Sequence, residues 1–137
     1  MLRIMFATVG LSLLAVSAVR ADPCEGRLPT RPGEVFAGTV RYVGDGDSLC
    51  VGRTADPNEW IEVRLADFDA PELREPDGRR SREILAGLAR GRQVNCVATR
   101  GRSGRVNSHD RVIATCRLNG HNLGNLLRSR GTPQGGN

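Results

Sequence analysis

Lysine is absent from this chain of 137 residues, so all 20 of its basic residues are arginine. Arginine presents a planar fork that can grip a phosphate through two hydrogen bonds, whereas lysine acts more as a point charge. A GC-rich genome, which favours arginine codons, is nevertheless the simpler explanation of this bias. The formal net charge of +5 therefore does not by itself identify a binding partner.

The chain also lacks an apolar run long enough to span a bilayer. Ile4–Val19 carries no charge but is shorter than the roughly 20 residues that a transmembrane helix needs. Arg3 supplies a positive start, and Val19-Arg20-Ala21 offers a small-x-small cleavage site. We expect residues 1–21 to be a secretory signal peptide, so that the protein is periplasmic or secreted and has no stable membrane association. An uncleaved membrane anchor is the alternative.

Cysteine pairs of the CxxC kind, which are typical of structural zinc sites, are missing as well. The four cysteines all follow the expected cleavage site, and an even number in a small exported domain favours disulfides. They are Cys24, Cys50, Cys96 and Cys116. Their number alone allows three pairings.

The remaining chain suffices for one domain and contains no internal repeat. Residues 22–34, rich in proline and glycine, predict an irregular lead-in. The domain itself is expected over residues 35–131, and residues 132–137 are expected to be a flexible tail. We expect a monomer.

Strand and helix patterns alternate along the domain. Short strands are predicted over 36–43, 48–53, 60–66, 93–98 and 111–118, with a helix over 79–90 and a short second helix ending at Gly131. Ile61, Val63 and Leu65 alternate with polar residues, which turns Arg64 to the opposite face. This order predicts a mainly β fold with two helices, a five-stranded OB-type barrel. Such barrels often bind nucleic acids, but a fold does not fix a function.

Two acidic segments lie where strands end. Asp45-Gly46-Asp47 follows the first strand, and Asp69-Ala70-Pro71-Glu72 follows the third. Each is also a common turn or loop signal. If the strands are adjacent, the acids converge at one rim and suit Ca²⁺, which takes several oxygen ligands, better than Mg²⁺ with its stricter geometry. Arg64 and Arg111 flank these acids and could hold a phosphodiester while water attacks phosphorus.

Four segments together resemble the staphylococcal-nuclease-like, or thermonuclease, family. They are Val-Gly-Asp-Gly-Asp-Ser at 43–48, Val-Arg-Leu-Ala-Asp-Phe-Asp-Ala-Pro-Glu at 63–72, His-Asp-Arg-Val-Ile-Ala at 109–114 and Asn-Gly-His-Asn-Leu-Gly at 119–124. The resemblance implies a Ca²⁺-dependent endonuclease that hydrolyses DNA or RNA and leaves 3′-phosphate ends.

The resemblance also implies a role for each matching residue. Asp47 and Asp69 would bind Ca²⁺ through their side chains, and Ala70, where the family usually has threonine, through its backbone carbonyl. Glu72 would orient or deprotonate the attacking water. Arg64 and Arg111 would grip the phosphate, and Asp45 would support the metal from outside its ligand shell.

The chain departs from the family in two places. His109 stands where relatives often have tyrosine, and it could stack on a base or simply be a solvated loop residue. The chain also stops soon after Gly131, so the final helix and aromatic residues of many relatives are not expected.

In the loop 99–110, Arg100, Arg102 and Arg105 could follow a phosphate backbone or simply be exposed.

The strand periodicity suggests which cysteines pair. Cys96 and Cys116 fall on the inward faces of neighbouring predicted strands, so we expect them to form one disulfide. Cys50 is out of phase with Leu49 and Val51, which predicts an outward side chain that bonds to Cys24 in the lead-in.

Two other functions fit the same residues. One is a non-catalytic OB-type binding module, although the complete acid and arginine set argues against it. The other follows from the resemblance, because secreted relatives are associated with exopolysaccharide (succinoglycan) production. A preference for DNA or RNA is not evident in the sequence.

Overall fold

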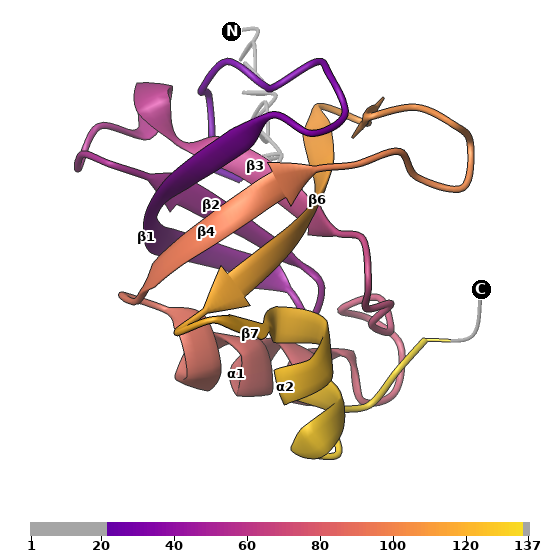
Figure 1. Cartoon of the computed structure of the whole chain (residues 1–137). Coiled ribbons are helices and arrows are strands. Elements are labelled where there is room, and N and C mark those ends of the chain that lie inside the picture. Colours follow the sequence, from indigo (N-terminus) through magenta and orange to yellow (C-terminus); the bar gives the residue numbers. More distant parts are fainter. Residues whose placement is uncertain (1–21, 136–137) are drawn as a thin grey trace, which may run out of the picture.

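Five strands pair edge to edge into a closed barrel in the computed structural model, which describes residues 22–135 (Figure 1). The barrel strands are β1 (Val35–Asp45), β2 (Ser48–Gly52), β3 (Ile61–Leu65), β4 (Gln93–Ala98) and β6 (Arg111–Leu118). β1, β2 and β3 form an antiparallel meander, β4 pairs with β1, and β6 pairs with β4. The barrel closes where β6 runs parallel to β3, with Val112 opposite Val63. The predicted mainly β, OB-type barrel is confirmed.

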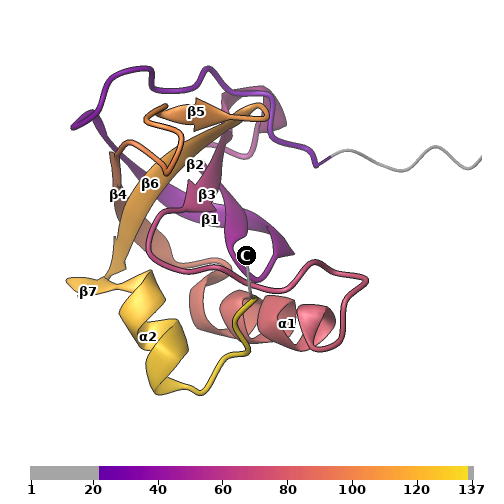
Figure 2. The same ribbon diagram turned by 90° about the vertical axis from the view of Figure 1, so that its right-hand side faces the viewer.

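Two helices cover one end of this barrel (Figures 1 and 2). They are α1 (Gly78–Ala89) and α2 (Leu123–Ser129), and the short elements are η1 (Pro57–Glu59), β5 (Asn107–Ser108) and β7 (His121–Asn122). Gly91 and Gly131 follow the two helices with φ values of 76° and 66°. This left-handed conformation suits glycine and ends each helix where the sequence predicts it.

Alternating side chains of the strands fill the barrel. In β4 the buried residues are Val94, Cys96 and Ala98, and in β6 they include Cys116, which is opposite Cys96 in the register. A disulfide joins Cys96 to Cys116, and a second one joins Cys24 to Cys50. Both predicted pairings are confirmed.

Cys50 lies on the outer face of the barrel, as predicted, but the lead-in covers it. Its exposed fraction is 1%, because the lead-in crosses β2 and the disulfide to Cys24 holds it there. The backbone N–H groups of Glu25 and Gly26 add hydrogen bonds to the carbonyls of Pro57 and Trp60. The segment 22–34 contains no helix or strand, but it forms an outer cover on β2.

The C-terminal segment corrects the expectation of a flexible tail. Thr132 is buried, the Ser81 hydroxyl of α1 donates a hydrogen bond of 2.7 Å to the carbonyl of Pro133, and the Gly135 N–H donates to the carbonyl of Asp69 at 2.9 Å. Figure 2 shows this segment running from α2 towards the loop that precedes α1. The prediction is wrong for residues 132–135 because these contacts are tertiary. Residues 136–137 lie outside the described part.

The predicted signal peptide, residues 1–21, also lies outside the described residues. Within residues 22–135, neither helix has the length and apolar character that crossing a membrane requires.

Candidate functional site

The turn between β1 and β2 is joined by hydrogen bonds to the loop that follows β3. Asp47 has an exposed fraction of only 5%, and its Oδ2 accepts a hydrogen bond of 2.7 Å from the N–H of Ala70. Its backbone carbonyl accepts another, of 2.8 Å, from the N–H of Leu65. Within the turn, the Asp47 N–H donates to Asp45 Oδ1 at 3.0 Å. The two acidic segments therefore converge at one rim of the barrel, as the sequence predicts.

Gly46 makes this close approach sterically feasible. A Cβ atom at this position would lie 2.5 Å from the Cβ of Ala70 and 2.6 Å from that of Ser81 in α1. Carbon atoms in contact are normally about 3.5–4.0 Å apart. The absence of a side chain thus lets the turn rest directly on the loop and on the helix.

Arg64 lies between the two acids. Its Nη1 is 3.1 Å from Asp47 Oδ2, and its Nη2 donates to Asp69 Oδ1 at 2.6 Å. Nη1 also donates to the backbone carbonyls of Leu65 and Phe68, both at 3.0 Å. The side chain is on the outer face of β3, as predicted, but only 23% of it is exposed. One guanidinium therefore fixes the relative position of the rim acids.

Arg102 reaches the same site from the long loop 99–110. Its Nη2 donates to Asp69 Oδ2 at 2.7 Å, although 76% of the side chain remains exposed. Asp69 thus has a guanidinium on each carboxylate oxygen. The loop therefore reaches the rim through Arg102, and the ion pair with Asp69 was not foreseen from the sequence.

Arg111, at the start of β6, completes a hollow of about 260 Å³ that Arg64, Asp69, Arg102 and Ser108 also line. The Nε of Arg111 is buried and has no hydrogen-bond partner among residues 22–135. A buried donor without a partner costs free energy, and an acceptor brought by a ligand would relieve that cost. The two predicted arginines therefore share one hollow with one of the predicted acids.

The carboxylates of Asp45 and Asp47 crowd each other. Burial, followed by repulsion from Asp45, raises the pKa of Asp47 to about 7, although the Ala70 N–H and Arg64 oppose this rise. Burial also tends to raise the pKa of Asp45, but hydrogen bonds from Asp47 and Ser48 and the charge of Arg111 outweigh it and leave that pKa below its ordinary value. Negative charge is in excess at this turn, and a bound cation would relieve it.

The donor chemistry of the rim fits a hard cation such as Ca²⁺, because Asp47 and Asp69 offer only oxygen atoms. Arg64 and Arg102 pair with the same oxygens, so a cation that used them would displace part of these ion pairs. The backbone of Gly135 packs closely against the carbonyl of Ala70, because a Cβ atom added at Gly135 would lie 2.7 Å from the carbonyl oxygen. This oxygen therefore has less room for a cation. Asp47 and Asp69 are the predicted residues that could hold such a cation.

Four other predicted residues neither line this hollow nor pair with the rim acids. Glu72 is exposed, and its side chain makes no hydrogen bond or ion pair with a described residue. Arg100 donates to the carbonyl of Gly104 within its own loop, at 2.8 Å. Arg105 is exposed, and His109 lies with φ of 50° in the exposed turn between β5 and β6. The β5 strand that forms this hairpin was missed, because two residues give too little periodicity.

A second group of acids forms where the lead-in meets the barrel. Asp22, Glu25, Glu62 and Asp110 line a hollow of about 290 Å³. The pKa of Glu62 is raised to about 7. Burial is the main cause, and the charge of Asp22 and a hydrogen bond with Asp22 add to it. Asp22 and Glu25 are distant in sequence from Glu62 and from Asp110, and the four share no motif, so no pattern could have brought them together.

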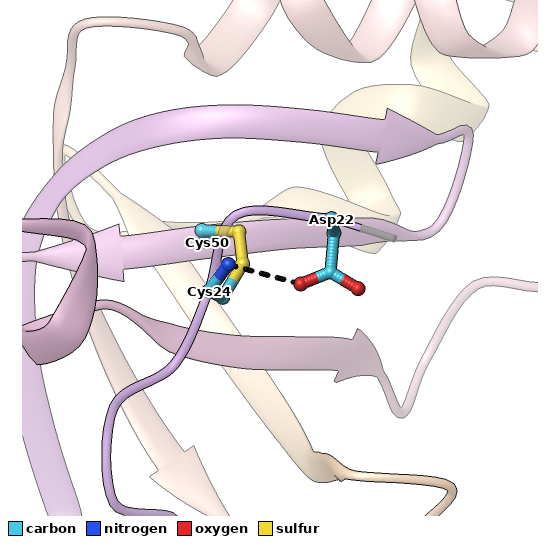
Figure 3. A group of neighbouring side chains, drawn as sticks. All are labelled: Asp22, Cys24 and Cys50. Carbon is cyan, nitrogen blue, oxygen red and sulfur yellow. Dashed lines mark hydrogen bonds between the residues drawn. A yellow bond between two sulfur atoms is a disulfide. The ribbon is translucent and has the colours of Figure 1, made fainter. Parts of the chain in front are cut away.

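Asp22 also lies beside the Cys24–Cys50 disulfide, and the Cys24 N–H donates to its Oδ1 at 3.0 Å (Figure 3). The two sulfur atoms are bonded to each other, and a metal would need them as thiolates. This group is therefore a structural anchor for the lead-in.

Comparison with known proteins gives one short similarity. No family model matches the chain. Protein ParB of Escherichia coli is 42% identical over 57 residues, which cover 42% of this chain and 30% of ParB. The chain thus spans less than a third of the length of this relative, and the match does not assign it to a family.

Proposed function

We propose that this protein is a Ca²⁺-dependent endonuclease that hydrolyses phosphodiester bonds of DNA or RNA and leaves 3′-phosphate ends. The observation that carries the proposal is the convergence of Asp47, Asp69, Arg64 and Arg111 at one barrel rim. The 3′-phosphate product follows from the thermonuclease resemblance of these segments.

The arginines would bind the scissile phosphodiester. Arg111 supports this role through its buried Nε, which has no hydrogen-bond partner among the described residues. The Arg64 side chain is already held by two acids and two carbonyls, so binding a phosphate would cost it little further conformational entropy. Fixed guanidiniums of this kind stabilise the negative charge that grows as water attacks phosphorus.

Asp47 and Asp69 would hold Ca²⁺, which when bound neutralises charge on the phosphodiester. Asp45 accepts a hydrogen bond from the Asp47 N–H, and its lowered pKa keeps it ionised, so it would add negative charge beside the metal site without binding the ion. Glu72 follows Ala70 by two residues and is exposed, so its carboxylate is accessible to orient or deprotonate a water molecule.

A cleavage assay tests this proposal. The chain from Asp22 onward is incubated with single-stranded DNA and with RNA, in Ca²⁺ or in a chelator. We expect Ca²⁺-dependent cleavage that Arg111→Ala and Glu72→Gln each lower by about 100-fold or more, because a charge-stabilising group or the water-orienting group is lost. Arg117→Ala, at an exposed arginine of the same strand as Arg111, is the matched control and should leave the rate unchanged.

The thermal midpoints of all variants should stay close to that of the wild type. The proposal fails if the wild-type protein cleaves neither polymer, or if Arg111→Ala and Glu72→Gln cleave as fast as Arg117→Ala.

Export is the second part of the proposal. Disulfides form and persist mainly in oxidising compartments, and the protein has two of them, one in the barrel and one in the lead-in. Fractionation of cells that express the full chain should find the protein in the periplasm or medium with residues 1–21 removed. Recovery of the full-length chain from the cytoplasm would contradict it.

A further inference from the structure

A second arginine-lined hollow lies along α1, apart from the rim hollow. Its volume is about 550 Å³, and Arg74, Arg79, Arg82 and Arg90 line it together with a single acid, Glu83. None of these residues lines the hollow that contains Arg64 and Arg111. The proposed catalytic roles leave this arginine cluster without an explanation.

The arginines of this hollow lack the acidic partners that Arg64 has. Arg82 Nε donates to the carbonyl of Val43 at 3.2 Å, which fixes that side chain against β1. The side chains of Arg74, Arg79 and Arg90 are exposed and make no hydrogen bond or ion pair with any residue of 22–135. Four like charges around a hollow with one acid create a positive potential that attracts anions.

The arrangement suits a chain of anions better than a single small one. Arg79, Arg82, Ala86 and Arg90 recur at helical spacing, so they follow one face of α1. With a rise of about 1.5 Å per residue, this stripe is about 16 Å long. A linear polyanion could therefore contact several guanidiniums at once.

Apolar side chains are also present in the hollow. Leu73 has an exposed fraction of 40%, and Ala86 also lines the hollow. Nucleic acid strands carry phosphates and, when single-stranded, apolar base faces as well. Guanidiniums beside exposed apolar atoms match both features.

We propose that this α1 hollow binds the phosphodiester backbone of a single-stranded nucleic acid that extends beyond the scissile bond. The proposal rests on the proposed nuclease function for its choice of polymer. Leu73 and Arg74 follow Glu72 directly in the chain, so the hollow begins next to the residue proposed to orient the attacking water. The α1 hollow thereby favours long substrates over short ones.

The test compares two triple variants of equal charge. Arg74→Gln, Arg79→Gln and Arg90→Gln remove the exposed arginines of the hollow and keep Arg82. Arg31→Gln, Arg53→Gln and Arg117→Gln remove three exposed arginines from elsewhere on the surface. Binding of a fluorescent 20-nucleotide single-stranded DNA is followed by anisotropy at several salt concentrations, with a chelator present to prevent cleavage.

We expect the first triple to raise Kd by about tenfold and to reduce the slope of log K against log salt by about 2, since each lost contact to a single strand contributes about 0.7. The control triple should change Kd by less than about twofold. Equal weakening by both triples would show attraction by net charge alone and overturn the proposal, as would no weakening by the first. Matching circular dichroism melts confirm that both triples fold.

Two further measurements separate this inference from its alternatives. A carboxylated polysaccharide, polygalacturonate, is used as a competitor; if it loses affinity in the first triple while DNA does not, the nucleic acid occupant is wrong. Cleavage of a dinucleotide, whose single phosphodiester is the scissile one and leaves none for the α1 hollow, should be the same in the first triple and the wild type. If the wild type cleaves nothing but only the first triple loses DNA binding, the nuclease proposal fails and the binding site stands.

Discussion

Two groups of carboxylates on this barrel differ in what surrounds them. The rim acids Asp47 and Asp69 share the guanidinium of Arg64, and Asp47 also accepts a backbone N–H. Glu62, in the group beside the lead-in, faces Asp22 and Asp110. The charge of Arg111 lowers the pKa of Glu62, but by less than burial and Asp22 raise it. Burial is the largest influence on the pKa of both Asp47 and Glu62.

The contrast shows that a raised pKa alone does not mark a functional site. The pKa of both Asp47 and Glu62 rises to about 7. Of the two, Asp47 pairs with Arg64, and Arg64 lines a hollow that could receive a phosphate. Perturbed pKa values also arise where acids are simply packed together. The following changes test this difference.

The largest effect is expected from removing the lead-in disulfide. Cys24→Ser with Cys50→Ser should lower the free energy of unfolding by roughly 3 kcal/mol, because the bond closes a loop with a sequence separation of 26. It should also lower the pKa of Glu62, since Asp22 is no longer held beside it. Denaturant unfolding and pH titration measure the two effects.

The second disulfide supplies the matched control. Cys96→Ser with Cys116→Ser removes a bond of similar separation, 20, from inside the barrel. Its removal should lower the free energy of unfolding by a similar amount but leave the pH dependence due to Glu62 in place. Loss of that pH dependence in both double variants would mean that Asp22 is not its local cause.

Next in size is the change Gly46→Ala at the rim. The new Cβ would collide with Ala70 and Ser81, so the turn that carries Asp47 must shift. We expect a stability loss of about 1–3 kcal/mol, as for overpacked cores, together with weaker Ca²⁺ binding. Urea unfolding and calorimetric titration with Ca²⁺ provide the measurements.

Gly87→Ala is its control, because a Cβ there meets no atom within 4 Å in the exposed part of α1. Alanine in a helix should stabilise by about 0.5–1 kcal/mol relative to glycine. Equal behaviour of the two variants would contradict the close packing of the turn.

A smaller effect is expected for Glu62→Gln. The folded protein holds the Glu62 proton more tightly than the unfolded chain does, because the pKa rises from 4.5 to about 7. Wild-type stability should therefore fall as pH increases from about 4.5 to 7, and glutamine should remove this fall. At pH 8 the variant should be more stable by on the order of 1 kcal/mol, and the proposed nuclease activity should be unchanged. Parallel stability curves against pH for the two proteins would refute this.

The smallest effect is expected for Arg102→Gln. This exposed guanidinium pairs with Asp69 Oδ2, an oxygen that the proposed Ca²⁺ site needs. Exposed ion pairs contribute about 0–1 kcal/mol, so we expect Ca²⁺ affinity without nucleic acid to rise by up to about fivefold. Calorimetry would measure this, and Arg100→Gln, whose side chain bonds within its own loop, should leave the affinity unchanged. Weaker Ca²⁺ binding in Arg102→Gln would instead mean that Arg102 supports the metal site.

Local patterns in the sequence determined much of the fold. The alternation in β3 and β4 gave the inward faces, and with them the Cys96–Cys116 pairing. Gly91 and Gly131 set the helix ends, since left-handed φ values are local properties of the backbone. The convergence of Asp47 with the loop after β3 followed from the adjacency of three consecutive strands, which is the simplest connection.

Only the tertiary structure decided the contacts between distant segments. Asp22 reaches Glu62, Arg102 reaches Asp69, and Gly135 reaches the Asp69 backbone across sequence separations that no periodic pattern records. These contacts depend on how loops and ends fold back over a finished barrel, and their side chains carry no distinctive local signal. The sequence therefore determined the barrel and the identity of its rim residues, while long-range packing decided which charges lie close enough to pair.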